Sequence, residues 1–215
     1  MLGYWVVRLL GCEKLEYLKI SKKINIIKMK KIVKFILKIL SFFSKRIKNY
    51  AFEWFLFSKA SFGLLLVNFI YQRIFRINSD ADIPVHFTSR IIDYKKIKFT
   101  KDENTVGSFC LSLNCYIQAM NGIEIGKNFL FAPGIRIISA NHGANNEFQD
   151  LNCKPVKIGD NVWFGTNVII LPEVSIGNNV VVGAGSVVTK SFPDNVIIAG
   201  NPAKVIKNLN EDVRK

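Results

Sequence analysis

The sequence predicts an all-β fold, a solenoid of short parallel strands in residues 77–215, preceded by a basic α-helical segment in residues 1–76. Two observations predict this arrangement: apolar residues recur every six positions through the second part, and positive charge is concentrated in the first. With 49% hydrophobic and 21% charged residues, the chain has enough apolar material for a core. This composition excludes a wholly disordered protein.

The basic segment contains 16 Lys/Arg and 3 Asp/Glu, a net charge of +13, whereas residues 77–215 contain 14 and 13, a net charge of +1. Residues 29–48 have a helical pattern. Polar residues three or four apart form one narrow stripe, which consists of Lys31, Lys34, Lys38, Ser41, Lys45 and Lys48. The other positions are mostly apolar. Such a helix is suited to lie in the headgroup region of a membrane, with its lysine ammonium groups near phosphates.

A second apolar stretch runs from Tyr50 to Phe75, but its longest uncharged run, Ala60–Gln72, has 13 residues and is too short to span a bilayer. We therefore predict that residues 1–76 lie on an anionic membrane surface, at the inner face of the cytoplasmic membrane. The alternative is a helical hairpin that packs on the main domain or in a subunit interface. Because Met29-Lys30-Lys31 resembles a bacterial start, residues 1–28 are interpreted as a mis-called start.

The six-residue repeat is strict over 36 residues. One apolar series occupies positions 158, 164, 170, 176, 182 and 188, and Val occupies positions 156, 162, 168, 174 and 180, with Ser186 ending that series. The same phase continues upstream at Ile123, Phe129 and Ile135 and at Ile125, Phe131 and Ile137, and more weakly at Leu111, Leu113, Ile117 and Ala119. An insertion of 15 residues, about Asn141–Pro155, leaves the repeat and returns in phase.

A period of six predicts short strands with inward apolar residues, joined by tight turns at Gly and Asn. Three hexads close one triangular coil of 18 residues, and each coil pairs its backbone with the next at about 4.8 Å. Residues 105–140 and 156–191 then supply two coils each. Residues 83–104 and 192–207 each add a partial coil, so about five to six coils are expected.

The chain resembles the hexapeptide-repeat acyltransferases over roughly residues 105–207. The resemblance depends on four segments, which are Ile137–His142 (IISANH), Ile158–Thr166 (IGDNVWFGT), Ile176–Lys190 (IGNNVVVGAGSVVTK) and Ala199–Lys207 (AGNPAKVIK). Within this family the chain is most similar to bacterial sugar and surface-polysaccharide O-acetyltransferases. The resemblance implies a left-handed parallel β-helix, a homotrimer with clefts between subunits, and acetyl-CoA as co-substrate.

The resemblance also implies the catalytic residue. His142 stands in Asn141-His142-Gly143 at the start of the insertion, where the family has its general base. An imidazole is suited to remove a proton from a sugar hydroxyl near neutral pH. Asn141 is a candidate substrate contact. His86, the other histidine, could contact the acceptor or pack structurally, and the structural interpretation is favoured.

Candidate coenzyme contacts follow from the same resemblance and are Trp163, Gly165, Thr166, Ala184, Thr189, Lys190, Lys204 and Lys207. Small residues such as Ala184 would let the pantetheine arm lie along the coil edge. Thr166 could donate a hydrogen bond to the developing oxyanion. The lysines would supply positive charge for the phosphates. Relatives often have Arg where Lys204 and Lys207 stand, and Lys lacks the bidentate geometry of Arg.

These observations predict a cytoplasmic acetyl-CoA-dependent O-acetyltransferase that acts on a sugar hydroxyl of a surface polysaccharide or its precursor. The alternatives are N-acetylation of an amino sugar, acetylation of an antibiotic, and a non-catalytic membrane scaffold. Two His per chain cannot supply the three zinc ligands of a γ-type carbonic anhydrase, and the four Cys form no CxxC pair, so no metal is expected. Neither a nucleotide-binding loop nor a nucleic-acid reader motif is present.

Overall fold

The computed structural model describes residues 60–141 and 154–209, together with Lys31, Lys34, Trp54, Phe55 and Ser58. The chain divides into two compact units, Met1–Phe52 and Glu53–Lys215. In the first unit only Lys31 and Lys34 are described, and both are helical and exposed. The rest of the predicted 29–48 helix lies outside the described residues. The second unit contains the repeat and also the last part of the segment 1–76.

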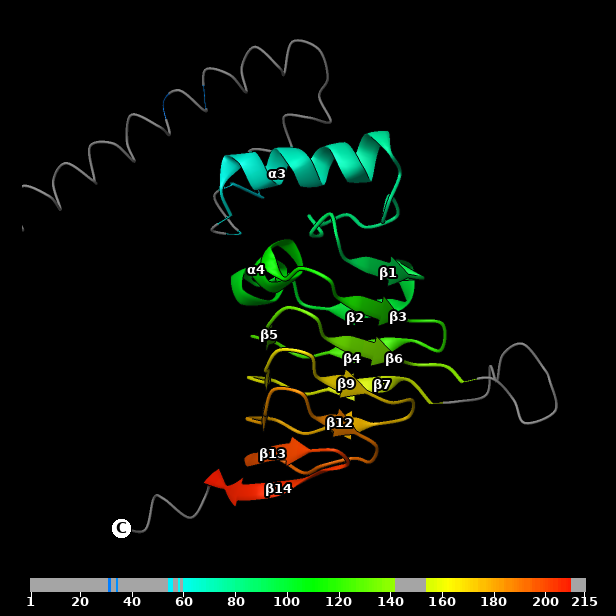
Figure 1. Cartoon of the computed structure of the whole chain (residues 1–215), viewed down its shortest axis with the longest axis vertical. Helices are drawn as coiled ribbons and strands as arrows, with labels where there is room; N and C mark the ends of the chain where they lie inside the picture. Colours follow the sequence, from blue (N-terminus) through cyan, green and yellow to red (C-terminus); the bar gives the residue numbers. More distant parts are fainter. Residues whose placement is uncertain are drawn as a thin grey trace, which may run out of the picture. The chain divides into compact units, whose positions relative to one another are not determined.

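Three sheets form the sides of a triangular coil (Figure 1). Sheet A contains β1 (Arg90–Ile92), β3 (Tyr116–Gln118), β6 (Arg136–Ile138), β9 (Ile169–Ile170) and β12 (Val187–Val188). Sheet B contains β2 (Ile97–Phe99), β4 (Ile123–Ile125), β7 (Val156–Ile158) and β10 (Ser175–Ile176). Sheet C contains β5 (Leu130–Phe131), β8 (Trp163–Phe164), β11 (Val181–Val182), β13 (Val196–Gly200) and β14 (Ala203–Asn208). All pairs are parallel except β13 with β14, so the described residues form a parallel β-helix.

The hexad positions form one continuous core. Every apolar residue of the two series between Val156 and Val188 is at most 3% exposed. The insertion returns in phase, as predicted, because β7 pairs with β4 in the register Ile123↔Val156 and Ile125↔Ile158. Ser186 is fully buried at the position where the Val series ends. Its hydroxyl donates to the Gly183 carbonyl at 2.6 Å and accepts from the Gly200 amide at 3.1 Å, which satisfies this polar group in the core.

Asparagine side chains stack along the corner between sheets B and C. Asn128, Asn161, Asn179 and Asn195 all have φ between 55° and 60°, a left-handed conformation that Asn tolerates better than other non-glycine residues. The side-chain amide of each of the first three donates to the carbonyl oxygen of the next, at 2.8–3.1 Å. The prediction of tight turns at Asn is confirmed for this corner.

One side of the first coil is a helix and not the expected strand. Residues predicted to start a β-coil instead form helix α4 (Glu103–Leu111), whose N-cap Asp102 accepts from the Thr105 amide at 2.9 Å. Leu111 and Leu113, assigned to inward positions of the weak upstream repeat, are 44% and 41% exposed, so that assignment was wrong. The helix takes the place of a sheet C strand above β5. The inward assignment of Ile117 and Ala119 is confirmed, since both are buried.

The segment before β1 covers the start of the coil stack. Helix α3 (Phe62–Phe69) continues into the π-helical turn η1 (Ile70–Ile74), and the hydroxyl of Ser61 accepts from the Leu64 amide at the helix start. The buried residues of this helical segment are Leu65, Asn68 and Gln72. Within the part of the chain that the structure describes, no helix combines the length and apolar character needed to cross a bilayer.

Candidate active site

The corner between sheets A and B, termed the A–B corner, is where the insertion leaves the coil. The chain departs after β6 and returns at β7, and Asn141 is exposed at this point. Thr189 and Lys190 are exposed at the same corner after β12, two strands from β6 in sheet A, which corresponds to about 10 Å along the stack. The ammonium group of Lys190 lies 5.8 Å from the centre of the Phe192 ring. His142 lies outside the described residues.

The corner between sheets C and A, termed the C–A corner, holds a second group of the predicted residues. Gly165, Thr166 and Ala184 follow β8 and β11 and stack directly on one another. A Cβ atom at Gly165 would come within 2.7 Å of the Ala184 backbone nitrogen, so this position requires glycine. The Gly185 amide donates to the Thr166 carbonyl at 2.8 Å. Thr166 and Ala184 are both exposed, which leaves a narrow strip of small residues open to solvent.

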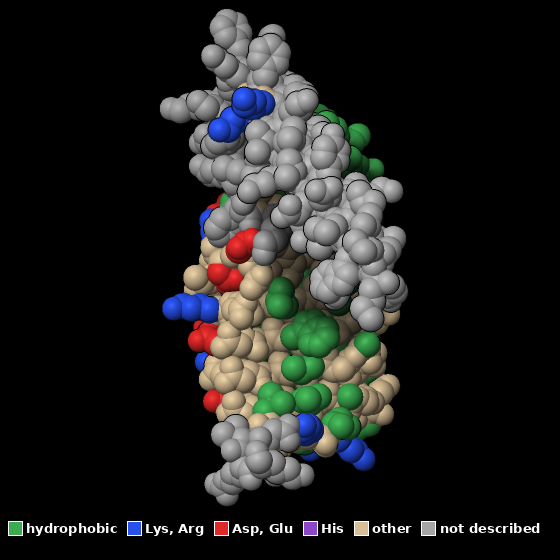
Figure 2. All heavy atoms as spheres, turned by 90° about the vertical axis from the view of Figure 1, so that its left-hand side faces the viewer, with side chains coloured by type: hydrophobic (Ala, Val, Ile, Leu, Met, Phe, Trp, Pro, Cys, Tyr) green, Lys and Arg blue, Asp and Glu red, His purple; other side chains and the backbone are tan. Residues whose placement is uncertain are grey.

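Trp163 belongs to the outer face of sheet C. The register places it between Leu130 and Val181, and Val181 is paired with Ile197, so four apolar residues form one outward column. Trp163 is 51% exposed and Leu130 is 40% exposed. Figure 2 views the molecule from the side on which β5 lies in Figure 1, and hydrophobic side chains gather on the coils there. The apolar column is therefore available for contact with another surface.

Lys204 and Lys207 lie on β14, at the last edge of sheet C. Both are exposed, and Lys207 is paired with Ile197 in the antiparallel register. The structure thus places these lysines beyond the coil that carries Thr189 and Lys190. Among the described residues, the predicted coenzyme contacts form three groups, which lie at the A–B corner, at sheet C with the C–A corner, and on β14.

The two corners are separated by the width of sheet A. Thr166 lies at one corner, and Leu171, five positions later in the chain, lies at the other. At about 3.3 Å per residue, the distance between the two corners is about 16 Å. The strands of sheet A form the coil wall between the two corners. Within one chain, therefore, Asn141 and Thr166 lie at different corners of the triangular coil.

His86 lies before β1, at the start of the coil stack. Its backbone amide donates to the Phe109 carbonyl at 2.9 Å, and its ring stacks on Phe87 with 4.7 Å between centroids. The Thr88 hydroxyl lies 2.9 Å from Nδ1, and the Thr88 amide lies 3.3 Å from the same nitrogen. Burial lowers the pKa of His86 below its usual value, because the charged imidazolium would lose hydration. These contacts hold the ring within the start of the coil stack.

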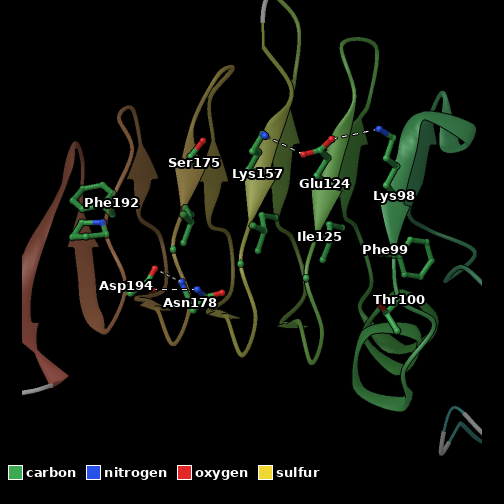
Figure 3. A pocket seen from close by; sticks show the side chains of 16 residues that line it. Lys98, Phe99, Thr100, Glu124, Ile125, Lys157, Ser175, Asn178, Phe192 and Asp194 are labelled. Carbon is green, nitrogen blue, oxygen red and sulfur yellow. Dashed lines mark hydrogen bonds and ion pairs between the residues drawn. The ribbon is translucent and has the colours of Figure 1, made fainter.

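Sheet B carries a charged outer face that the sequence reasoning did not identify. Lys98 on β2, Glu124 on β4 and Lys157 on β7 are aligned by register, and Figure 3 shows Glu124 between the two lysines. The Glu124 carboxylate lies 3.2 Å from the Lys157 ammonium and 3.4 Å from that of Lys98. The hydrogen bond from Lys157, with smaller effects of its charge and of Lys98, lowers the pKa of Glu124.

An open groove of about 660 Å³ follows this charged face and ends near Phe192 (Figure 3). None of the predicted site residues lines it. A sequence signal does exist for the charged face. The middle residues of the aligned tripeptides Ile97-Lys98-Phe99, Ile123-Glu124-Ile125 and Val156-Lys157-Ile158 are the ones that face outward.

A second polar cluster lies beside the start of sheet B. The Tyr94 hydroxyl donates to Asp82 at 2.6 Å, and Lys101 forms an ion pair with the same carboxylate at 2.5 Å. Burial opposes ionisation of Asp82, but the hydrogen bonds from Lys101 and Tyr94 outweigh it and lower the pKa of this carboxyl. Burial, and next the hydrogen bond to Asp82, raise the pKa of Tyr94. In the described part of the chain, no three His, Cys, Asp or Glu side chains form a group suited to a metal ion.

Comparison with known proteins gives a consistent assignment for the repeat. The family described as "Bacterial transferase hexapeptide (six repeats)" matches residues 155–190. The galactoside O-acetyltransferase of Escherichia coli K12 is 39% identical over 107 residues, which cover 48% of this chain and 53% of that protein. WbbJ of the same strain, provisionally named a lipopolysaccharide biosynthesis O-acetyl transferase, is 39% identical over 111 residues, which cover 46% of this chain and 57% of WbbJ.

Among solved structures, a galactoside acetyltransferase in complex with coenzyme A is 37% identical and matches 46% of this chain and 52% of that chain, with a TM-score of 0.42. The chain spans about half the length of the curated relatives it matches. The parallel sheets and the repeat fit a left-handed parallel β-helix, the handedness that the resemblance implied. Residues 155–190 thus match the family of hexapeptide-repeat bacterial transferases, and the repeat segment is similar to proteins named O-acetyltransferases.

Proposed function

We propose that this protein is an acetyl-CoA-dependent O-acetyltransferase that modifies a sugar hydroxyl of a surface polysaccharide or its precursor. Similar proteins are named galactoside O-acetyltransferase and, provisionally, a lipopolysaccharide biosynthesis O-acetyl transferase. The observation that carries the proposal is the insertion at the A–B corner. It departs from a fully packed coil and returns in register, so Asn141 stands at the end of a rigid frame, and His142 follows it in the sequence.

His142 is proposed as the general base. Its imidazole would accept the proton of the sugar hydroxyl as the hydroxyl oxygen attacks the acetyl carbonyl carbon. The same group can return this proton to the departing thiolate when the carbon–sulfur bond breaks. Asn141, the preceding residue, is proposed to hold the acceptor sugar. The Thr166 hydroxyl or the amides of the C–A corner would donate hydrogen bonds to the carbonyl oxygen as it gains negative charge.

The exposed residues fit a coenzyme A thioester, which supplies the activated acetyl group when bound. The strip formed by Gly165, Ala184 and Gly185 has no large side chain, so an extended pantetheine arm can approach its backbone. Lys190 at the A–B corner and Lys204 and Lys207 on β14 offer positive charge for phosphates, each as a single ammonium group. In this proposal the strip would hold the pantetheine arm, and the lysines, which lie at other places on the coil, would pair with the phosphates.

We further propose a homotrimer, as the resemblance implies. The two corners of one chain are about 16 Å apart, so Asn141 of one copy and Thr166 of another must meet for both groups to act on one acetyl group. The outward column of Leu130, Trp163, Val181 and Ile197 offers an apolar surface for such an assembly. Light scattering should return about three times the mass of one chain, and a stable, active monomer would contradict the shared site.

The decisive experiment measures acetyl transfer from acetyl-CoA to a panel of sugars, amino sugars and lipid-linked glycans, together with a coenzyme A binding titration. We expect His142→Ala to lower the maximal rate roughly 10²–10⁴-fold, with little change in coenzyme affinity. Lys127→Ala, an exposed change at the B–C corner, is the matched control and should leave the rate unchanged. Near-normal turnover in the His142 variant would overturn the mechanism. Transfer to amines alone would favour N-acetylation.

A further inference from the structure

Helix α3 and turn η1 have an inverted distribution of polar and apolar residues. An ordinary surface helix buries an apolar stripe and exposes polar residues. Here the residues spaced three and four apart that face the β-helix are Leu65, Asn68 and Gln72. Asn68 and Gln72 are at most 1% exposed. The two side-chain amides of the segment are therefore buried, whereas Arg73 is exposed.

Buried polar groups require partners, and the start of the coil stack supplies them. The Asn68 amide donates to the Cys110 carbonyl at 3.3 Å and accepts from the Phe87 amide at 3.0 Å. The Gln72 amide donates to the Ile83 carbonyl at 3.0 Å and accepts from the Val85 amide at 3.1 Å. The polar face of the helix thus binds the backbone before β1 and one carbonyl of α4, and this orientation turns the apolar face outward.

The outer face of α3–η1, defined as Leu66, Ile70, Ile74 and the adjoining Phe75, is an exposed apolar surface. Leu66 is 43% exposed, Ile74 is 65% exposed and Phe75 is 64% exposed. Exposure of several large apolar side chains together marks a contact surface, because each loses favourable free energy by remaining in water.

We propose that the outer face of α3–η1 inserts into the headgroup boundary of an anionic membrane. Residues 61–76 contain two arginines, Arg73 and Arg76, and no Asp or Glu. Residues 1–52, which lead into the segment, contain 13 Lys/Arg and 2 Asp/Glu, a net charge of +11. An apolar face whose own helical segment contains arginines and no carboxylate is complementary to lipid tails beneath anionic headgroups.

Charge also distinguishes a lipid surface from a second copy of the chain. In a symmetric contact between two α3–η1 faces, arginines would meet arginines, and the segment offers no carboxylate to neutralise them. A lipid surface has no such conflict. The proposal is independent of acetyl transfer, since it concerns only how the protein binds the membrane.

The experiment compares two isoleucines that are both 65% exposed, Ile74 on the outer face and Ile206 on β14. The α3 segment covers the start of the stack and β14 closes its other end (Figure 1). Each is replaced by Cys in the full chain, with Cys12 and Cys153 changed to Ser, and labelled with an environment-sensitive NBD dye. Cys110 and Cys115 are buried and are left in place. Each protein is titrated with phosphatidylcholine vesicles, with and without phosphatidylglycerol.

We expect the Ile74→Cys dye to shift to the blue with phosphatidylglycerol vesicles and much less with pure phosphatidylcholine, whereas the Ile206→Cys dye stays unchanged. In unlabelled protein, Leu66→Ser/Ile74→Ser/Phe75→Ser should lower the vesicle partition coefficient roughly tenfold to a hundredfold. Val205→Ser/Ile206→Ser is the matched control and should bind like the unaltered protein.

Three outcomes would overturn the proposal. The first is a dye at position 74 that is already shielded in buffer and unaffected by lipid, because another segment or a second copy would then cover this face. The second is an equal shift at both positions. The third is partitioning of the outer-face variant at the level of the unaltered protein. If the triple variant does not fold, the two dye measurements still decide, because the two labelled proteins share the Cys12→Ser and Cys153→Ser changes and differ only in which exposed isoleucine is replaced.

Discussion

The start of the coil stack and the coils that follow satisfy the same backbone groups in different ways. Between β6 and β13 most strand amides and carbonyls pair with the neighbouring coil, as in Trp163 to Val180 and Gly183 to Ile198. The first strands have no preceding coil, and side chains take its place. Asn78 bonds to the Ile91 amide, and Thr105 and Ser108 of α4 accept from the Phe129 and Phe131 amides.

This difference explains why the two regions have different sequences. A regular coil needs only an inward apolar residue at every second strand position and a small residue at the turn. The same six-residue sequence pattern therefore recurs. The start of the stack needs hydroxyls and amides at particular places, and these places follow no period. A solenoid end is a sheet edge, and covering it with a helix also protects it from pairing with another chain.

The largest effect on stability is expected at the start of the stack. Gln72→Leu removes a donor to the Ile83 carbonyl and an acceptor for the Val85 amide in a site that is only 1% exposed. Each buried group left without a partner costs about 1–3 kcal/mol, so the free energy of unfolding should fall by about 2–5 kcal/mol. Urea unfolding followed by circular dichroism measures this change. A loss below about 1 kcal/mol would mean that water can replace the side chain.

Within the regular coils, tight backbone approach should decide stability. A Cβ atom at Gly159 would lie 2.7 Å from backbone atoms of Gly177, so Gly159→Ala should lower the free energy of unfolding by about 1–3 kcal/mol. Gly63→Ala in α3 is the matched control. Its Cβ meets nothing within 4 Å, and replacing a helical glycine should stabilise by about 0.5–1 kcal/mol. Thermal melts of both variants test the contrast, and equal effects of one sign would contradict it.

The smallest effect is a pH dependence at His86. Because its folded-state pKa lies below the unfolded value of about 6.5, the unfolded chain binds a proton more readily. The stability that His86 contributes is therefore complete above pH 6.5 and declines as the pH falls below it. His86→Gln should remove the part of the pH dependence of the unfolding free energy that is due to His86, while the parts due to other groups remain. The free energies of unfolding of the unaltered protein and of His86→Gln are measured at pH 5.5 and 7.5. An equal change with pH in the two proteins would exclude His86 as the cause.

The site could be predicted only in part. Spacing predicts the insertion, its return in phase and the glycines at the C–A corner. It does so because each repeat pairs with a neighbour that has the same pattern of apolar and small residues. The charged face of sheet B was not found, since Lys98, Glu124 and Lys157 are 26 and 33 residues apart and meet only through register. The separation of the corners by sheet A is also a property of the closed coil.

By itself, the sequence determined the regular coils, from the inward apolar residues of β7 to β12 to the Gly and Asn at the turns. These features are local, and their period is a direct consequence of pairing each coil with the next. Only the tertiary structure decided that helix α4 replaces a strand of the first coil, that Leu111 and Leu113 are exposed, and that α3 turns Asn68 and Gln72 inward. At the end of the stack the backbone has no neighbouring coil, so the nearest polar side chains must satisfy it, and which ones do so depends on the packing of the whole unit.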